Sequence, residues 1–389
     1  MHCQLASRIL VQSSWQGALR RSFALSSSCR RFCNNVVNHQ HQSNSHHRNN
    51  KSHPISSSSP ITPVATRYRP VSFYRLTPLS QERVEQLRKQ IFDQLTTWGV
   101  VGRIYLAPEQ GISGINCQIA APIHMLPMVR QFFDSLDMGQ IEYTEGLEDL
   151  DTPCFRKLRV MIKKNLVAIK DVLPANEIEI QKEQHLDPEE WHRQLSEKGS
   201  DAILVDMRNH YEYDIGRFDH AIKLDVDTFR EGLDELERMM LARPDKEVYM
   251  YCTGGIRCTA TSSYFANKGI GKNLKMLKGG ITAYGQYIRQ NPKEQSLFRG
   301  KNFTFDDRRG ERVTHDVLAR CFQCGAPCDV LHNCANTRCH LLFVQCDECR
   351  TRMNKACSDL CRQVLEGKRT WNMEYDYHRQ IRPSLLCNE

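Results

Sequence analysis

The sequence predicts an α/β protein in which a central parallel sheet is flanked by a smaller α+β domain and a cysteine-rich module. Over residues 185–298, short apolar segments alternate with helical patterns, which predicts a parallel sheet with helices on both faces. Residues 70–172 show the order β-α-β-β-α-β, which is typical of a ferredoxin-like α+β sandwich. Residues 300–389 have little periodic structure, but nine of the 17 cysteines lie within 321–361. We expect bound metal to stabilise this last part, because it contains few core residues.

Residues 1–65 predict a targeting leader that continues into a disordered linker. The first 80 residues contain ten Lys and Arg and no acidic residue, whereas residues 81–389 contain 43 basic and 45 acidic residues. An arginine-rich, acid-free start favours a mitochondrial location, with a plastid location or a plain disordered tail as alternatives. The rest of the chain is close to neutral, so any contact with nucleic acid would depend on local basic patches. No apolar run approaches the ~20 residues that cross a bilayer, so we expect no membrane span.

The amino-terminal domain is expected to contain five strands and two helices. Periodicity predicts strands over 71–77, 100–107, 112–119, 141–144 and 158–169, and helices over 81–98 and 125–136. In the last strand, apolar and basic residues alternate, namely Leu158, Val160 and Ile162 with Lys157, Arg159 and Lys163. Its basic face could hold the phosphates of a nucleic acid, or it could be the ordinary solvated face of a half-buried strand.

The central domain is expected to contain buried strands over 202–206, 248–251 and 274–277, with helices over 227–240, 259–268 and 281–290. Ligands of open parallel sheets bind at the carboxyl ends of the strands. Cys252 follows directly on one of these strands, so we place the candidate site there.

The loop from Cys252 to Arg257 predicts a reactive thiolate. Between these two residues lie Thr253, Gly254, Gly255 and Ile256. The glycines allow consecutive backbone N–H groups to turn inward and bind an anion, and the start of the next helix adds further donors. Arg257 adds a permanent positive charge. We expect Cys252 to act as a nucleophile, with Arg257 and the loop holding negative charge on its sulfur. The alternative is an inert buried cysteine beside a turn.

Three neighbouring features leave their roles open. Cys258, in the first turn of the helix, could be a resolving thiol for Cys252 or a small packing residue. Asp206 and Arg208 end the adjacent strand, and we expect them to support the loop from behind rather than to contact a substrate. His210 and Glu212 have the H-x-E spacing of two ligands in non-haem iron oxygenases, although so short a motif also occurs by chance. The sequence contains no flavin fingerprint and no haem attachment motif.

The cysteine-rich segment predicts two metal sites of four thiolates each. The candidate ligands form four closely spaced pairs: Cys321 with Cys324, Cys334 with Cys339, Cys346 with Cys349, and Cys357 with Cys361. Cys328 is left over. Ligand type and spacing favour structural zinc, with an iron–sulfur cluster or redox disulfides as alternatives. The spacing does not determine which pairs share a metal.

The central segment resembles the rhodanese domain. The residues that carry the resemblance are Val205-Asp206-Met207-Arg208 with Glu212, residues 251–257, and Leu277-Lys278-Gly279-Gly280-Ile281. In that family the active cysteine accepts a sulfane sulfur and becomes a persulfide, and Cys252 occupies the equivalent position. Related dual-specificity phosphatases use a loop one residue longer. The four residues between Cys252 and Arg257 therefore favour sulfur over phosphate as the bound group.

Longer stretches resemble the rhodanese-domain tRNA uridine 5-hydroxylase family. They are residues 206–213, Cys-Thr-Gly-Gly-Ile-Arg-Cys over 252–258 and Cys-Phe-Gln-Cys-Gly-Ala-Pro-Cys over 321–328, and the resemblance covers about 70–385 in the same order. Bacterial members typically have glycine where this chain has His220, and an acidic and a basic residue where it has Thr259-Ala260.

This resemblance implies that the chain is an oxidoreductase that hydroxylates carbon 5 of the wobble uridine. Molecular oxygen would be the co-substrate, and Cys252 would act as the reactive thiol or persulfide. The implied partners are tRNA and a sulfur donor. The amino-terminal domain and the cysteine-rich module would hold the tRNA. The basic residues available near the module are Arg308, Arg309, Arg312, Arg350 and Arg352, which could equally be solvated surface. Two alternatives remain: a thiosulfate-type sulfurtransferase acting on a small acceptor, and a zinc-bearing interaction protein with a vestigial rhodanese domain.

Overall fold

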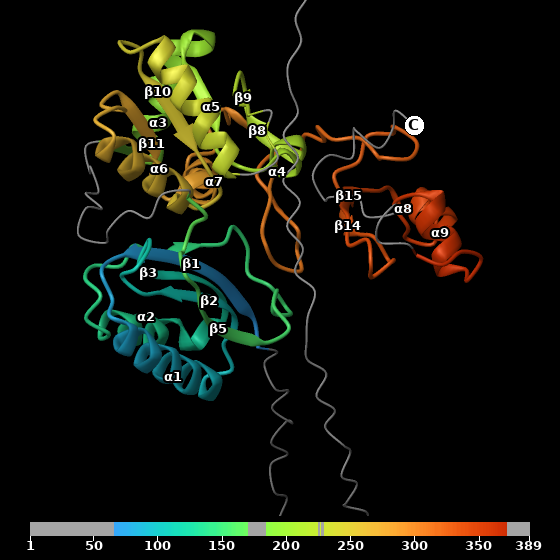
Figure 1. Cartoon of the computed structure of the whole chain (residues 1–389), viewed down its shortest axis with the longest axis horizontal. Coiled ribbons are helices and arrows are strands. Elements are labelled where there is room, and N and C mark those ends of the chain that lie inside the picture. The colour runs from blue at the N-terminus through green and yellow to red at the C-terminus, as the bar shows by residue number, and fades with distance from the viewer. Residues whose placement is uncertain (1–65, 170–183, 225, 227–228, 372–389) are drawn as a thin grey trace, which may run out of the picture. The chain divides into compact units, whose positions relative to one another are not determined.

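The computed structural model describes residues 66–169, 184–224, 226 and 229–371 (Figure 1). The predicted leader over 1–65 lies outside the described residues, as do 170–172 and 372–389 of the two predicted outer domains. Among the residues that the structure describes, no helix combines the length and the apolar composition needed to cross a bilayer.

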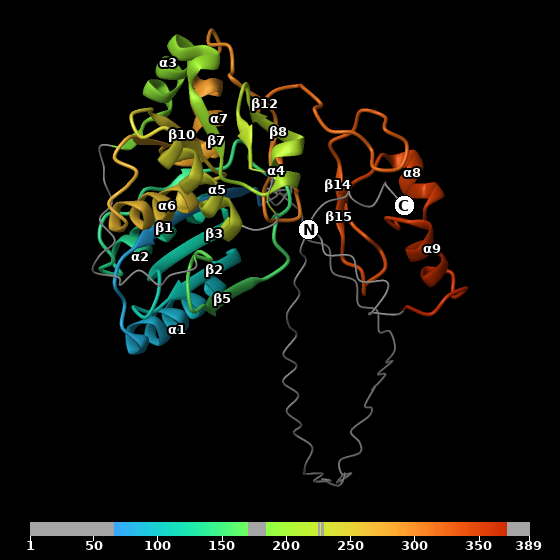
Figure 2. The same ribbon diagram turned by 45° about the horizontal axis from the view of Figure 1, so that its top comes forward.

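The amino-terminal domain is a five-stranded sheet with two helices on one face (Figures 1 and 2). Its strands are β1 Tyr68–Leu76, β2 Val101–Ala107, β3 Gly114–Pro122, β4 Thr144–Glu145 and β5 Leu158–Ile162, in the order β4-β1-β3-β2-β5. Only the β2/β5 pair is parallel. The helices are α1 Gln81–Thr97 and α2 Leu126–Asp134, the latter preceded by the 3₁₀ helix η1 Ile123–Met125.

The alternation of side chains along these strands separates a core face from a polar face. Phe73, Ile104 and Ile115 are buried and pack in one core with Leu87 and Ile91 of α1. Because successive side chains of a strand point to opposite faces, the residues between them project away from both helices. The predicted β-α-β-β-α-β order is confirmed, although the strand expected over 158–169 ends at Ile162.

The central domain is a parallel sheet of five strands with helices on both faces. The strands are β6 His185–Leu186, β7 Ile203–Asp206, β9 Ile222–Lys223, β10 Val248–Tyr251 and β11 Leu274–Leu277, in the order β6-β11-β10-β7-β9. The helices are α3 Pro188–Lys198, η4 Gly199–Asp201, α4 His210–Ile215, α5 Phe229–Ala242, α6 Ile256–Asn267 and α7 Gly280–Gln290. One apolar core contains Leu236 of α5 and Phe265 of α6, and another contains Trp191 of α3 and Ile281 of α7. The predicted covered parallel sheet is thereby confirmed.

Several short elements were not predicted. Strands of two or three residues, such as β6 and β9, are too short to show periodicity. The helix expected over 259–268 begins earlier, at Ile256, because Gly255 ends the loop with a φ of 97° and the chain enters the helix directly. Arg257 and Cys258 therefore lie in the first turn of α6. His220 adopts a φ of 61°, a left-handed conformation that glycine adopts without strain.

The remaining chain returns to the central domain and then forms the cysteine-rich module. β8 Gly216–Phe218, β12 Phe298–Asn302 and β13 Glu311–Arg312 form a three-stranded sheet in the order β13-β12-β8. The module contains the hairpin of β14 Leu331–Asn333 and β15 Leu342–Val344, with the helices α8 Asp347–Arg352 and α9 Asp359–Leu365. Its small core consists of four buried cysteines packed with residues such as Leu341 and Phe343. This core lacks the large apolar cluster that would stabilise a module of this size without metal.

Candidate active site and candidate metal centres

A cavity of about 730 Å³ connects the Cys252 loop with the polar face of the amino-terminal sheet. Its wall includes Cys252, Thr253, Gly254, Ile256 and Arg257 from the loop and the start of α6. The opposite wall includes Ser72 and Tyr74 of β1, Arg103 and Tyr105 of β2, and Asn116 and Gln118 of β3. The structure thus brings the predicted loop residues together at the carboxyl end of β10, where the parallel sheet predicts a ligand site.

The surroundings of Cys252, which directly follows β10, favour the thiolate form of its side chain. The side chain is only 1% exposed, and the backbone N–H of Gly255 donates a hydrogen bond to its Sγ over 3.1 Å. Burial opposes ionisation, but hydrogen bonds from Cys258 and Gly255 and the charge of Arg257 outweigh it and lower the pKa of Cys252 to about 5. A thiol with such a pKa is almost fully ionised at neutral pH and is therefore a strong candidate nucleophile.

Two glycines determine the shape of the loop. A Cβ atom on Gly255 would lie 3.0 Å from the Tyr74 hydroxyl oxygen, and one on Gly280 would lie 2.5 Å from the carbonyl oxygen of Cys252. The tight approach at Gly280 allows the N–H of Ile281 to donate to the Cys252 carbonyl over 3.0 Å. The start of α7 therefore holds the backbone of the Cys252 loop from behind.

Arg257 is fixed by Glu212, a carboxylate that the sequence analysis did not assign to it. Nη1 donates to Oε2 and Nη2 donates to Oε1, both over 2.9 Å, and the Glu212 side chain is fully buried. Burial opposes ionisation of Glu212, but the charge and hydrogen bonds of Arg257 keep its pKa below the ordinary value. Asn209 and Thr253 also donate to this carboxylate. Glu212 lies three residues after the helix cap Asn209, which is the spacing of a capping box and the one local signal for its position.

Asp206 and Arg208 form a buried ion pair behind the loop. Arg208 Nε donates to Asp206 Oδ1 over 2.9 Å, and both side chains are at most 1% exposed. Arg208 also lies over the rings of Tyr251 and Phe298. Neither member of the pair lines the cavity, and Asp206 lies beside Tyr251 in the pairing of β7 with β10. The pair therefore connects the ends of these two strands.

Further polar residues surround the loop. Burial, followed by the interaction with the nearby Cys252 sulfur, raises the pKa of Cys258 well above the ordinary value. The hydroxyl groups of Tyr74 and Thr259 are 2.8 Å apart, and His185 Nε2 lies 3.1 Å from the same Thr259 oxygen. Tyr74 and His185 line the cavity but were not predicted, because only tertiary packing brings them to the loop.

The H-x-E motif does not present two metal ligands. Glu212 uses both carboxylate oxygens for Arg257, whereas His210 Nδ1 lies 4.0 Å from Asp214, one turn further along α4. Within the described ranges, the clusters of three or more potential ligand residues are the two groups of cysteines in the carboxy-terminal module.

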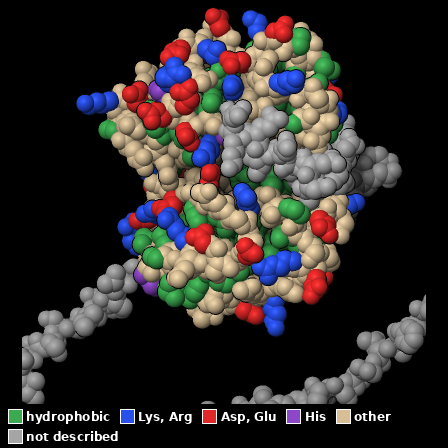
Figure 3. Space-filling view, turned by 90° about the vertical axis from the view of Figure 1, so that its left-hand side faces the viewer, with side chains coloured by type: hydrophobic (Ala, Val, Ile, Leu, Met, Phe, Trp, Pro, Cys, Tyr) green, Lys and Arg blue, Asp and Glu red, His purple; other side chains and the backbone are tan. Residues whose placement is uncertain are grey.

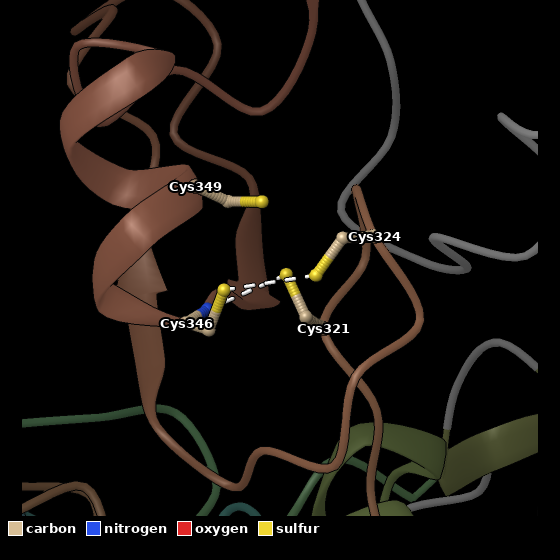
Figure 4. Close-up of side chains that lie close together, drawn as sticks. All are labelled: Cys321, Cys324, Cys346 and Cys349. Atoms are coloured by element: carbon tan, nitrogen blue, oxygen red, sulfur yellow. Dashed lines mark hydrogen bonds between the residues drawn. The ribbon is translucent and has the colours of Figure 1, made fainter.

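The eight predicted cysteine ligands form two groups of four. Cys321, Cys324, Cys346 and Cys349 make one group (Figure 4), and Cys334, Cys339, Cys357 and Cys361 make the other. Within each group all sulfur atoms lie within 4.8 Å of one another. The two groups are interleaved along the chain. The pair Cys334 and Cys339 lies between the two pairs of the first group, and the pair Cys346 and Cys349 lies between the two pairs of the second group.

The sulfur geometry fits a tetrahedral metal. The Sγ atoms of Cys324 and Cys346 are 3.7 Å apart, as are those of Cys357 and Cys361. Four thiolates at the usual Zn–S distance of ~2.3 Å would be separated by ~3.8 Å. Backbone N–H groups also donate to the sulfur atoms, as from Cys346 to Cys321. Cys328 is buried but belongs to neither group.

Most of the arginines near the module already have intramolecular partners. Arg308 binds Asp306 and Glu311, and Arg312 binds Asp329. Arg309 donates to Asn333, and Arg352 donates to the sulfur of Cys349. These arginines are therefore less available to a nucleic acid than their sequence suggests. Figure 3 shows another face of the molecule, on which Lys and Arg side chains are likewise mixed with Asp and Glu rather than gathered.

Three family models match consecutive parts of the chain. The model described as "UPF0176 acylphosphatase like domain" matches residues 68–166, "Rhodanese-like domain" matches 187–287, and "Rhodanase C-terminal" matches 299–362. Together with the two cysteine groups, these matches confirm the predicted fold class: a rhodanese-like domain between an α+β domain and a cysteine-rich module.

Curated relatives cover most of the chain. A tRNA uridine(34) hydroxylase of Photorhabdus laumondii is 40% identical over 305 residues, which cover 76% of this chain and 81% of the relative. Proteins of the same name from an Enterobacter strain and from Leptospira interrogans are 38% and 39% identical and cover 75% and 76% of this chain, and 80% and 77% of the relatives. The prediction of a mitochondrial leader, with a plastid alternative, is wrong, because these relatives come from bacteria, which contain neither organelle. Basic tails of other kinds share the arginine-rich, acid-free composition of organellar leaders, so composition could not distinguish the two.

Proposed function

The chain belongs to the tRNA uridine(34) hydroxylase family, and we propose that it hydroxylates carbon 5 of the wobble uridine of tRNA with molecular oxygen as co-substrate. For this chain the proposal rests above all on Cys252. It combines a pKa of about 5 with a place in the wall of a cavity of about 730 Å³. That volume lies in the usual range of small-molecule pockets, ~300–1,000 Å³.

The place of Cys252 requires the substrate base to enter the cavity. The sulfur is buried, so a base that remains stacked in an RNA loop could not reach it. Nucleobase-modifying enzymes solve this problem by splaying the target nucleotide into a pocket. The wobble position lies in a single-stranded loop, where unstacking costs less than in a duplex.

In the proposed reaction, Cys252 supplies the reactive sulfur as a thiolate or as a persulfide received from a sulfur donor. The N–H of Gly255 holds the negative charge, and Arg257, fixed by Glu212, contributes a positive field. Hydroxylation by molecular oxygen consumes two electrons and forms one water. Oxidation of the thiols of Cys252 and Cys258 to one disulfide would supply these two electrons and two protons, and the electrostatic interaction between the two sulfur groups places them near each other. A disulfide between them, detected by mass spectrometry after a single turnover, would be the expected product.

For the module we propose two structural zinc ions, one in each group of four cysteines. The four-thiolate ligand set and the sulfur separations of 3.7 Å support zinc at these positions. The metals would hold the hairpin and the helices α8 and α9 together in a module with few core residues.

A thiosulfate-type sulfurtransferase acting on a small acceptor is the second candidate. The rhodanese-like match over 187–287 and the loop of four residues between Cys252 and Arg257 support it. The cavity wall formed by the amino-terminal sheet favours the tRNA reaction instead, since a small acceptor would not need that second domain.

The deciding experiment is nucleoside mass spectrometry of tRNA from cells that lack this protein. The cells are rescued with wild type, with Cys252→Ser, or with Cys154→Ser as a control for a buried cysteine outside the cavity. We expect 5-hydroxylated wobble uridine to vanish in the deletion and to return with wild type and Cys154→Ser only.

If the modification persists in the deletion, the hydroxylase proposal fails. Transfer of sulfur from thiosulfate to cyanide by the purified protein would then support the second candidate. If Cys252→Ser restores the modification fully, the proposed role of Cys252 fails, and a non-catalytic, zinc-bearing interaction role for the rhodanese-like domain gains support.

A further inference from the structure

The polar face of the amino-terminal sheet carries two ordered rows of side chains opposite the Cys252 loop. Strand register places residues side by side across β1, β3 and β2. The rows are Tyr74, Asn116 and Tyr105, and Ser72, Gln118 and Arg103. All six residues line the cavity that contains Cys252. This cavity therefore has a reactive wall and a second wall whose polar groups the proposed chemistry does not use.

Two side-chain amides on this wall have no hydrogen-bond partner among the described residues. Asn116 and Gln118 are half-buried, and within the described part of the chain neither amide group takes part in a hydrogen bond. A half-buried amide without a partner is ready to bind a polar ligand. Each amide presents one donor and one acceptor side by side. The edge of a uracil base presents N3–H beside a carbonyl oxygen, which is the complementary pair.

Tyr105 provides a stacking surface beside these amides. Lys163 Nζ lies 5.1 Å from the centre of its ring, and no described aromatic side chain packs against that ring. Proteins that bind unstacked bases commonly combine an aromatic ring on a sheet with amides that read the base edge.

Tyr74 connects the sheet wall with the Cys252 loop. Tyr74 is the strand neighbour of Asn116, and its hydroxyl oxygen would lie 3.0 Å from a Cβ atom on Gly255. Side chains directly opposite on neighbouring strands are separated by ~5 Å at their Cβ atoms. Asn116 thus lies one strand away from a residue that already reaches the Cys252 loop.

A basic edge continues the same sheet. Arg159 of β5 pairs in register with Arg103, and Lys163 and Lys164 follow directly. These three residues are exposed, and none of them forms an ion pair with a described residue. Cations at the rim of a base-binding surface that have no described carboxylate partner are suited to the phosphates of the RNA strand, and Lys163 also lies beside the Tyr105 ring.

We propose that this sheet face is the subsite for the wobble base: the base stacks on Tyr105, its edge pairs with the amide of Asn116 next to Gln118, and Arg159, Lys163 and Lys164 contact the flanking phosphates. In this pose the base lies between the sheet and Cys252. The inference rests on the proposed function and adds to it the surface that recognises the substrate.

The test compares the affinity of full-length protein for two anticodon stem-loop RNAs, one with uridine at position 34 and one with an abasic site there. All variants carry Cys252→Ser, so that the base is not modified during the measurement. The protein with Cys252→Ser alone should bind the uridine RNA about tenfold or more tightly than the abasic RNA, because one stacked and paired base typically contributes an affinity difference of this size.

Asn116→Leu and Tyr105→Leu should each remove most of this difference while leaving the affinity for the abasic RNA unchanged. The unchanged affinity shows that the variants are folded. Tyr105→Phe, which keeps the ring, and Gln131→Leu, which removes an exposed amide on α2, should keep the difference. Arg159→Ala should weaken binding of both RNAs alike and reduce its dependence on salt.

The inference is overturned if the Asn116 and Tyr105 variants keep the full preference for uridine, or if the protein with Cys252→Ser alone shows no preference. Neither result contradicts the proposed function, which is decided by the tRNA nucleosides of the deletion cells. Conversely, if the Asn116 and Tyr105 variants lose the preference for uridine RNA over abasic RNA, the subsite is supported. This holds even if the nucleoside that the enzyme forms is not 5-hydroxylated uridine.

Discussion

Arg257 and Glu212 face each other through two parallel hydrogen bonds of 2.9 Å, from Nη1 to Oε2 and from Nη2 to Oε1. From the sequence we expected Arg257 to hold an anion on the sulfur directly. In the structure its guanidinium is fixed by a fully buried carboxylate, and its charge still helps to lower the pKa of Cys252. The N–H of Gly255, which donates to the sulfur directly, shares the stabilisation of the thiolate with this charge.

Glu212→Gln should destabilise the protein, because it leaves the mostly buried charge of Arg257 without a counter-charge. Removing one partner of a buried ion pair costs ~3–5 kcal/mol in the free energy of unfolding. Urea denaturation measures this loss. The control is Glu190→Gln, which breaks an exposed pair with Arg193 on α3 and should change the free energy of unfolding far less, because water screens exposed charges. Equal effects of the two substitutions would contradict a structural role for the Arg257 pair.

Gly255→Ala and Gly254→Ala should differ sharply although the glycines are adjacent. Gly255 has a φ of 97°, and its Cβ would lie 3.0 Å from the Tyr74 hydroxyl oxygen, whereas Gly254 has nothing within 4 Å and no positive φ. Alanine at 255 adds ~1–3 kcal/mol of backbone strain and displaces the N–H that binds the Cys252 sulfur.

Loss of one such donor lowers kcat by ~100-fold in other enzymes. We expect a loss of this size for Gly255→Ala in a hydroxylation assay and a smaller loss for Gly254→Ala, whose methyl group would meet no protein atom within 4 Å, although Gly254 lines the cavity. Similar losses at both positions would show that the loop tolerates no side chain anywhere, and the role of the Gly255 N–H would lose its support.

The sequence predicted the parts of the site that are contiguous in the chain. The strand, glycine loop and helix around Cys252 produce strong local signals, and so do the cysteine pairs of the module. Glu212, Tyr74 and His185 approach the loop only through tertiary packing, over separations such as 185 residues between Tyr74 and Thr259. Local periodicity cannot report such contacts. Which cysteine pairs share a metal could not be predicted either, because their spacing in the sequence is compatible with several groupings.

The pH dependence of alkylation tests the state of Cys252. The rate of Cys252 modification by iodoacetamide, followed by peptide mapping, should reach half its maximum near pH 5. A thiol with the ordinary pKa would reach half its maximal rate near pH 9. Cys154 in the same protein is the internal control, because burial raises its pKa to about 12 and should keep it unreactive below pH 9. Cys258→Ala removes a hydrogen bond to the thiolate and should move the Cys252 midpoint to higher pH.

The same lowered pKa predicts how stability varies with pH. The folded protein releases the Cys252 proton near pH 5, whereas the unfolded chain releases it near pH 9, so the folded state binds fewer protons between these values. The free energy of unfolding of wild type relative to Cys252→Ser should therefore increase as the pH rises from 5 to 9. This contribution is lost as the pH falls through 5. A flat difference over this range would show that the thiol is not ionised in the folded protein.

Substitutions in the two cysteine groups should reveal both the metal count and the interleaving. We expect two zinc ions per chain by elemental analysis, one fewer in Cys346→Ser or Cys361→Ser, and no change in Cys328→Ser, which alters a buried cysteine outside both groups. Cys334 and Cys339 lie in the chain segment between Cys324 and Cys346, so each metal closes a loop that carries half of the other site.

Loss of the first metal should therefore weaken the binding of the second metal. The zinc that remains in Cys346→Ser should be released at a lower chelator concentration than the zinc of Cys328→Ser. Iron in place of zinc would contradict the predicted metal, and unchanged chelator sensitivity would show that the two sites fold independently.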